Sequence, residues 1–144
     1  MAFESNYVTF IGNLTDDPEL RFTQGGHAVC TVRLASNRRW TNRDGQEGEE
    51  TTYLNVNLWR EMAENVAETF SKGDRAIAIG RLKVRSYENR DGQTVWVTEI
   101  EADEVAPSLR WAKATIDRNS SGSGGPRGES STTPAPPSDD DVPF

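Results

Sequence analysis

The sequence predicts a small all-β barrel that carries one helix, and three observations lead to this fold. Five segments are rich in Val, Ile, Thr and aromatic residues and alternate with a period of two. Asp-Gly turns separate two pairs of neighbouring segments, and one stretch changes to helical spacing. A chain of 144 residues has room for one compact domain and some additional chain. We therefore expect a single folded domain.

The expected strands carry apolar residues on one face along most of their length. They cover Tyr7–Leu14, Ala28–Asn37, Thr51–Trp59, Ala76–Tyr87 and Thr94–Ala102. Asp44-Gly45 lies between the second and third strands, and Asp91-Gly92 lies between the fourth and fifth. This dipeptide favours tight hairpin turns. Each of these two pairs of strands is therefore predicted to form an antiparallel hairpin.

The helical stretch is Arg60–Ser71, between the third and fourth strands. Its apolar residues Met62, Val66 and Phe70 are four apart, with glutamates on the outer side. Lys72-Gly73 then indicates a cationic last turn and a stop. Five strands with a helix in this position follow the order of the OB-fold, a Greek-key barrel that binds oligonucleotides. The alternative, a five-stranded SH3-like barrel, usually lacks a full helix there.

The composition divides the chain into three expected regions, which are a folded domain at 1–112, a flexible linker at 113–138 and an acidic tip at 139–144. Between Asn119 and Ser138, 16 of 20 residues are Gly, Ser, Thr or Pro. Such a stretch buries too little apolar surface to offset the entropy of ordering it. The tip joins three carboxylates to an apolar end and consists of Asp139, Asp140, Asp141, Val142, Pro143 and Phe144.

Several classes of function are excluded by what the chain contains. One cysteine, Cys30, and one histidine, His27, are too few for an internal disulfide or a Cys/His zinc site. The three Asp of the tip are not preorganised for a metal, and no phosphate loop or nucleophile elbow is present. We expect no enzyme, no cofactor and no metal. No apolar run is long enough to span a membrane, so the expected location is the cytoplasm.

The formal net charge of −7 opposes nucleic-acid binding only if charge is spread evenly. Basic residues instead concentrate in 33–43 and 72–90, whereas acidic residues gather in 44–50, on the helix and in 99–104. A locally basic groove is therefore expected on an acidic protein, and the local field decides what binds there.

Strand alternation groups aromatic, amide and cationic side chains on one face. On the fourth strand, this face carries Arg81, Lys83, Arg85 and Tyr87, with Leu82 and Val84 on the reverse. On the third strand, it carries Tyr53, Asn55, Asn57 and Trp59, with Leu54, Val56 and Leu58 on the reverse. Because a barrel needs its aliphatic face for the core, we expect the aromatic face to meet a ligand rather than pack inside.

The remaining tryptophans have different expected roles. Trp40 follows Arg38 and Arg39, an arrangement that suits base stacking beside phosphate contacts. Trp96 is undecided between core and surface because its neighbours Val95 and Val97 compete for the core. Trp111 is expected to pack against the domain.

Four stretches resemble bacterial single-stranded-DNA-binding proteins. They are Tyr7–Phe22, Ala35-Ser36-Asn37 leading to Trp40, Lys72-Gly73-Asp74 leading to Gly80-Arg81-Leu82, and the tip Asp-Asp-Asp-Val-Pro-Phe. The resemblance covers about residues 5 to 112 and the last six. It implies an OB-fold homotetramer that wraps single-stranded DNA without reading its sequence. It also implies a tip that recruits replication, recombination and repair proteins, and a nucleoid-associated location.

Carried over by position, the stacking aromatics of that family fall on Trp40, Tyr53, Trp59 and Tyr87, two of which are Tyr where many members have Trp. Phosphate-contacting cations fall on or near Arg21, Lys83 and Arg85. With the other basic residues of these strands, the candidate DNA-backbone contacts are Arg21, Arg33, Arg38, Arg39, Arg81, Lys83 and Arg85. In some relatives a segment like Glu104–Ala112 adds a strand that braces the tetramer. Two other functions stay open, which are a module for structured RNA or a protein partner, and an enzyme with an OB domain as substrate clamp.

Overall fold

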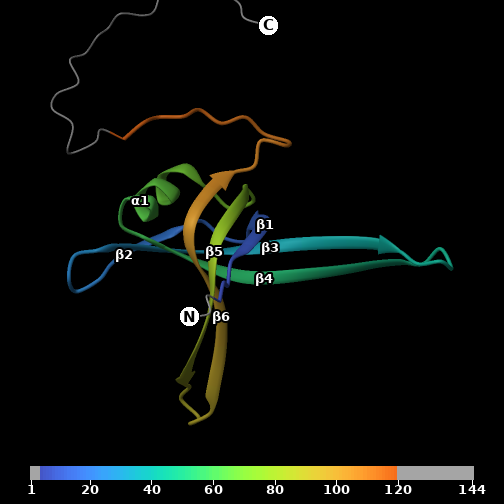
Figure 1. The fold of residues 1–144 in the computed structure, drawn as a ribbon, viewed down its shortest axis with the longest axis horizontal. Helices are drawn as coiled ribbons and strands as arrows, with labels where there is room; N and C mark the ends of the chain where they lie inside the picture. Colours follow the sequence, from blue (N-terminus) through green and yellow to red (C-terminus); the bar gives the residue numbers. More distant parts are fainter. Residues whose placement is uncertain (1–3, 120–144) are drawn as a thin grey trace, which may run out of the picture. The chain divides into compact units, whose positions relative to one another are not determined.

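The computed structural model describes residues 4–119. Its elements are β1 (Val8–Leu14), β2 (Glu19–Phe22), β3 (Ala28–Thr41), β4 (Glu47–Trp59), α1 (Arg60–Thr69), β5 (Arg75–Glu88) and β6 (Thr94–Pro107) (Figure 1). All of them belong to one compact unit, Met1–Ala114. The linker expected at 113–138 lies mostly outside the described residues, and the tip at 139–144 lies wholly outside them.

The strands close into a barrel. Their order is β1-β5-β6-β4-β3-β2, and β1 also pairs with β3 through Asn13 and Leu14. The hairpins β3–β4 and β5–β6 are antiparallel, as predicted from the Asp-Gly turns, and Gly45 and Gly92 adopt positive φ there. β4 and β6 run parallel through Asn55–Asn57. The predicted OB-fold is confirmed.

One strand was not predicted. β2 has four residues, all of them exposed, and it pairs along the first residues of β3. A strand this short, without a buried face, has no alternation that a sequence pattern can detect.

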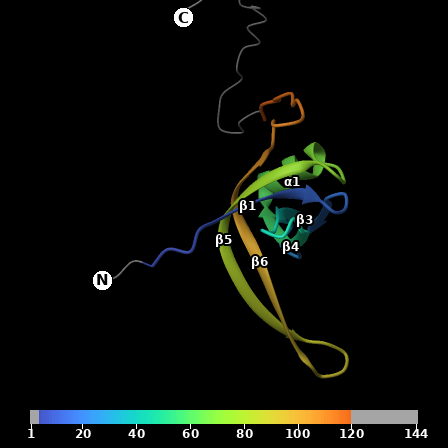
Figure 2. The same ribbon diagram turned by 90° about the vertical axis from the view of Figure 1, so that its right-hand side faces the viewer.

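Both hairpins extend beyond the barrel as two-stranded arms, the β3–β4 arm in one direction and the β5–β6 arm in another (Figures 1 and 2). β3 and β4 stay paired from Val29 with Trp59 to Thr41 with Glu47, farther than the predicted ends at Asn37 and Thr51. Apart from Trp40 and Gly48, the added residues are polar, because an arm outside the core needs no apolar face. For the same reason Val84, expected on the core side, is 58% exposed.

The core lies inside the barrel, under α1. Val56 and Leu58 are fully buried, while Leu54 and Leu82 pack against the core in part, as the alternation predicts. α1 contributes Ala63, Val66 and Phe70 to the same cluster. Removing one large side chain from such a core costs about 2 to 5 kcal/mol.

The helix ends earlier than predicted. Its last residue is Thr69, and it has no basic residue in its last turn. Lys72 and Gly73 instead form the turn that leads into β5, where Gly73 has positive φ and donates its N–H to the carbonyl of Leu14 at 2.9 Å. The prediction that Lys72-Gly73 forms the last turn and stop of the helix is therefore wrong, because these residues belong to the following turn.

The end of the domain shows where the segment Glu104–Ala112 and the last two tryptophans lie. Glu104–Pro107 continues β6 past a bulge at Asp103, and no separate strand follows among residues 108–119. Trp111, expected to pack against the domain, is 72% exposed. Its ring contacts the guanidinium groups of Arg75 and Arg110, at 4.7 and 4.9 Å from the ring centre. Trp96 is on the surface, 70% exposed. No helix within residues 4–119 is long and apolar enough to cross a membrane.

Candidate functional site

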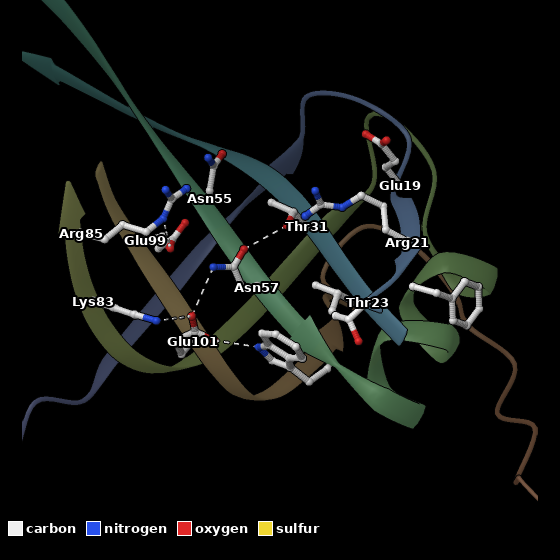
Figure 3. A pocket seen from close by; sticks show the side chains of 13 residues that line it. Glu19, Arg21, Thr23, Thr31, Asn55, Asn57, Lys83, Arg85, Glu99 and Glu101 are labelled. Atoms are coloured by element: carbon white, nitrogen blue, oxygen red, sulfur yellow. Dashed lines mark hydrogen bonds and ion pairs between the residues drawn. The ribbon is translucent and has the colours of Figure 1, made fainter. Parts of the chain in front are cut away.

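A hollow of about 620 Å³ lies on the outer face of the barrel, across β2 to β6 (Figure 3). Four of the predicted site residues line it, namely Arg21, Trp59, Lys83 and Arg85. Strand pairing explains how they meet. Arg21 pairs with Val29, Val29 pairs with Trp59, and β6 lies between β4 and β5. Side chains at directly paired positions, and those two residues away on the same strands, point to the same face of the sheet.

Hydrogen bonds connect the polar lining into one network. Thr31 donates its hydroxyl to Oδ1 of Asn57 at 3.0 Å, and Nδ2 of Asn57 donates to Oε1 of Glu101 at 3.3 Å. The indole Nε1 of Trp59 donates to Oε2 of the same glutamate at 3.0 Å. Trp59 is therefore anchored through its ring edge, while 47% of the residue stays exposed.

Two ion pairs cross from β5 to β6 within the hollow. Nε of Arg85 lies 2.9 Å from Oε1 of Glu99, and Nζ of Lys83 lies 3.6 Å from Oε1 of Glu101. Figure 3 shows both cations reaching these carboxylates from the neighbouring strand. The expected separation of acidic from basic residues is therefore wrong here, because antiparallel pairing brings the acids of 99–104 beside the basic strand.

The strand alternation placed the amides Asn55 and Asn57 on the ligand-facing side without a specific role, and it gave no site role to the carboxylates Glu99 and Glu101. A signal for the glutamates existed. The predicted turn at Asp91-Gly92 pairs Glu88 with Thr94, and counting back from it places Lys83 opposite Glu99.

The other predicted aromatics lie outside this hollow. Trp40 and Tyr87 are on the two arms, and Tyr53 lies where the β3–β4 arm leaves the barrel. Tyr53 is 52% exposed, Tyr87 48% and Trp40 38%. A guanidinium lies over each ring: Arg33 over Tyr53 at 4.8 Å, Arg38 over Trp40 at 5.7 Å and Arg85 over Tyr87 at 6.0 Å from the ring centre. Arginine beside an exposed ring is a typical surface for stacked bases.

Trp40 lies near the end of the β3–β4 arm, directly opposite Gly48. A Cβ atom at position 48 would overlap the indole, so glycine lets the ring lie flat on the partner strand. Trp40 and Arg39 line a second hollow of about 550 Å³ at this end. By strand alternation, however, Trp40 belongs to the opposite face from Tyr53, so the four aromatics do not form one continuous row.

Arg81 lies in a third hollow of about 490 Å³ that shares Trp59, Lys83 and Glu101 with the first. These three residues therefore separate two adjacent depressions. Of the remaining predicted cations, Arg33 lies on the barrel part of β3 opposite Asn55. Arg38 and Arg39 belong to the β3–β4 arm, where Nε of Arg39 lies 3.7 Å from Oε1 of Glu49.

Other chemistry is not assembled in the described part of the chain. Residues 4–119 contain no group of His, Cys, Asp and Glu that could hold a metal ion. His27 is exposed in the turn between β2 and β3. Cys30 is buried, and desolvation raises the pKa of its thiol. The pKa of the Tyr7 hydroxyl is also raised, mainly by the hydrogen bond it donates to Asp103.

Comparison with known proteins gives consistent results. Residues 5–108 match the Single-strand binding protein family. The single-stranded DNA-binding protein of Corynebacterium glutamicum is 52% identical over 124 residues, which cover 85% of this chain and 55% of that protein. That of Paenarthrobacter nicotinovorans is 52% identical over 120 residues, which cover 82% of this chain and 70% of that protein. That of Mycolicibacterium smegmatis is 49% identical over 115 residues, covering 78% and 70%. The chain thus spans little more than half the length of the first of these relatives.

Proposed function

The chain belongs to the single-strand binding protein family, and from this premise we propose that it binds single-stranded DNA without sequence preference. Membership agrees with the expectation of a DNA-binding protein that is not an enzyme. The observation that carries the proposal is the hollow that exposed Trp59 lines together with Arg21, Lys83 and Arg85.

The proposed mechanism uses two features of an unpaired strand. Base faces stack on the exposed rings of Trp40, Tyr53, Trp59 and Tyr87, and each stacked base contributes about 1 to 3 kcal/mol. Phosphates contact the neighbouring cations, Arg21, Arg33, Arg38, Arg39, Arg81, Lys83 and Arg85. Both contacts are independent of base identity. Affinity therefore comes from the sum of several modest interactions.

Titration of the intrinsic tryptophan fluorescence with poly(dT) tests this proposal, because stacking quenches exposed indoles. We expect quenching that saturates and that weakens as salt is raised. Duplex DNA and a folded RNA serve as comparisons in the same assay. Absence of quenching by poly(dT) would contradict the proposal, and quenching by the folded RNA alone would support the RNA-module alternative.

We further propose that the protein assembles as a homotetramer. β1 pairs with β5 over Val8–Asn13 but meets β3 only at Asn13 and Leu14. Its other edge is therefore unpaired over residues 8–12 within the described chain. On this strand Ile11 is 38% exposed, and Tyr7, which directly precedes the strand, is 61% exposed. Closed symmetry between copies would cover such an edge.

We also propose that the tip Asp139–Phe144 recruits proteins of DNA replication, recombination and repair in the cytoplasm, at the nucleoid. Three carboxylates are repelled by DNA phosphates, so a direct role in DNA binding is electrostatically unfavourable. A basic pocket on a partner protein could instead hold the Phe144 ring and pair with the aspartates.

A further inference from the structure

We propose that Glu99 and Glu101 are internal counterions of Arg85 and Lys83, and that a DNA strand enters the hollow by exchanging phosphates for these carboxylates. The inference rests on the proposed binding of single-stranded DNA. It concerns what limits the affinity of that binding.

The composition of the hollow raises the question. Its charged lining consists of three cations, Arg21, Lys83 and Arg85, and three carboxylates, Glu19, Glu99 and Glu101. Its formal charge is therefore zero, in a chain whose net charge is −7. A polyanion gains nothing from the average field of such a surface. Binding there requires that individual cations become available to phosphates.

The difference in exposure between the two partners of each ion pair shows how the cations become available to phosphates. The Glu99 side chain is 4% exposed, whereas the Arg85 side chain above it is 49% exposed. Likewise the Glu101 side chain is 19% exposed and that of Lys83 is 54% exposed. The carboxylates thus lie underneath and the cations face solvent. A strand approaching from solvent meets the cations first and can draw them away from the carboxylates.

The two carboxylates are fixed more firmly than the cations. Glu101 accepts hydrogen bonds from Asn57 and from the Trp59 indole, so it stays in place when Lys83 turns outward. Glu99 is buried and cannot follow Arg85 into solvent. After the exchange each carboxylate lacks its cation partner, and this cost reduces the net gain from each phosphate contact.

The exchange has a measurable signature in salt dependence. A cation that contacts phosphate releases counterions from DNA, which gives a slope of about −0.7 per contact in log K against log salt for a single strand. A carboxylate that loses its internal partner attracts a cation from solution, which offsets part of this release. The unmodified protein should therefore show a shallower slope than its number of phosphate contacts implies.

Glu-to-Gln substitutions test the inference with little change in shape. In Glu101→Gln the amide oxygen can still accept from Trp59, and the Asn57 amide can turn to meet the new NH₂ group. In Glu99→Gln the oxygen can still accept from Arg85. We expect each variant to bind poly(dT) about three- to tenfold more tightly at low salt. Each should also show a salt slope steeper by up to about 0.7.

Glu104→Gln is the matched control. This exposed glutamate also lies on β6, where it is opposite Ile79 and not opposite a cation, and it does not line the hollow. The substitution changes the net charge equally, and we expect little effect on affinity or slope. Circular dichroism and thermal melting confirm folding, and Glu101→Gln alone is sufficient for the test if the buried position 99 does not tolerate the change.

A double-mutant cycle with Lys83→Gln tests whether the effect of Glu101→Gln on affinity acts through Lys83. If Glu101 acts as the counterion of Lys83, Glu101→Gln should tighten binding in the native background and have little effect when Lys83 is already neutral. Equal tightening in both backgrounds, or unchanged or weaker binding in both glutamine variants, would overturn the inference. Failure of the unmodified protein to bind poly(dT) would instead contradict the proposed function, so the two failures are distinguishable.

Discussion

Trp59 illustrates how a single side chain is prepared for stacking. Its Nε1 donates to Oε2 of Glu101, and that glutamate is held in turn by Asn57 and Lys83. The indole is therefore restrained before any ligand arrives, which lowers the entropy that binding must overcome. Trp40 is restrained differently, by lying against Gly48 of the partner strand.

We expect Trp40→Ala and Trp59→Ala each to weaken binding to single-stranded DNA by about 1 to 3 kcal/mol and to leave the fold largely intact. The reason is that both rings are exposed and belong to no core cluster. Fluorescence or calorimetric titration measures the first effect and thermal melting the second. Trp111→Ala is a control, since this ring is more exposed than either and lies outside the hollow. Unfolding in either test variant would place that ring in the core.

Gly48→Ala should weaken binding through Trp40 alone. The added methyl group overlaps the indole and forces it off the partner strand, so we expect a loss no greater than that of Trp40→Ala, about 1 to 3 kcal/mol. In the double variant the glycine change should add almost nothing. Additive losses would show that Gly48 acts on the arm itself and not on the ring.

At the scale of elements, the turn from β4 into α1 contains a strained residue. Arg60 begins the helix with φ of 60°, the left-handed region that non-glycine residues seldom adopt. Relief of this strain in Arg60→Gly should raise the free energy of unfolding by up to about 1 kcal/mol. Arg60→Val, β-branched, should lower it. Thermal melts of the two variants give the sign of each change in stability. A stabilised valine variant would contradict the assignment of strain to Arg60.

Alternation was sufficient to predict most elements and the orientation of their faces. Asn55, Val56, Asn57 and Leu58 lie on the sides that the pattern indicates, because a buried face must be apolar whatever lies across from it. The position of Glu99 and Glu101 was missed for the opposite reason. Whether an acid is solvated or paired depends on the neighbouring strand, and the pattern within one strand does not contain that information.

The remaining differences between predicted and observed burial arise where the core ends. Val84 lies on an arm beyond the barrel, and Trp111 follows the last strand, so neither has an interior to enter. An apolar residue is predicted to be buried only on the assumption that packing partners continue past it. That assumption fails along hairpin arms, and the length of an arm depends on interactions that leave little trace in local composition.

At the scale of the whole molecule, we expect self-association into a homotetramer through surfaces that include the open edge of β1. Sedimentation velocity at micromolar concentration measures this directly. A charged substitution, Ile11→Lys, should shift the distribution toward smaller species, because charge on an exposed edge opposes strand pairing. Gln46→Lys, exposed in the turn between β3 and β4 and away from β1, is the comparison for added charge alone. A monomer in the unmodified protein would count against the proposal.

Changes in the tip Asp139–Phe144 should affect partner recruitment without weakening DNA binding. Its three aspartates repel phosphate, and a Gly/Ser/Thr/Pro-rich segment precedes it, a composition typical of a tether that lets an end reach outward. A purely solubilising tail needs charge but no phenylalanine. We therefore expect deletion of Val142–Phe144 to leave poly(dT) affinity unchanged or slightly higher and to abolish the pull-down of replication and repair proteins from a cell extract. Phe144→Ala, which keeps all three aspartates, should give most of the same loss, because the ring fills the partner's pocket. Retention of the same partners by both variants would show that the tip acts through charge alone or not at all.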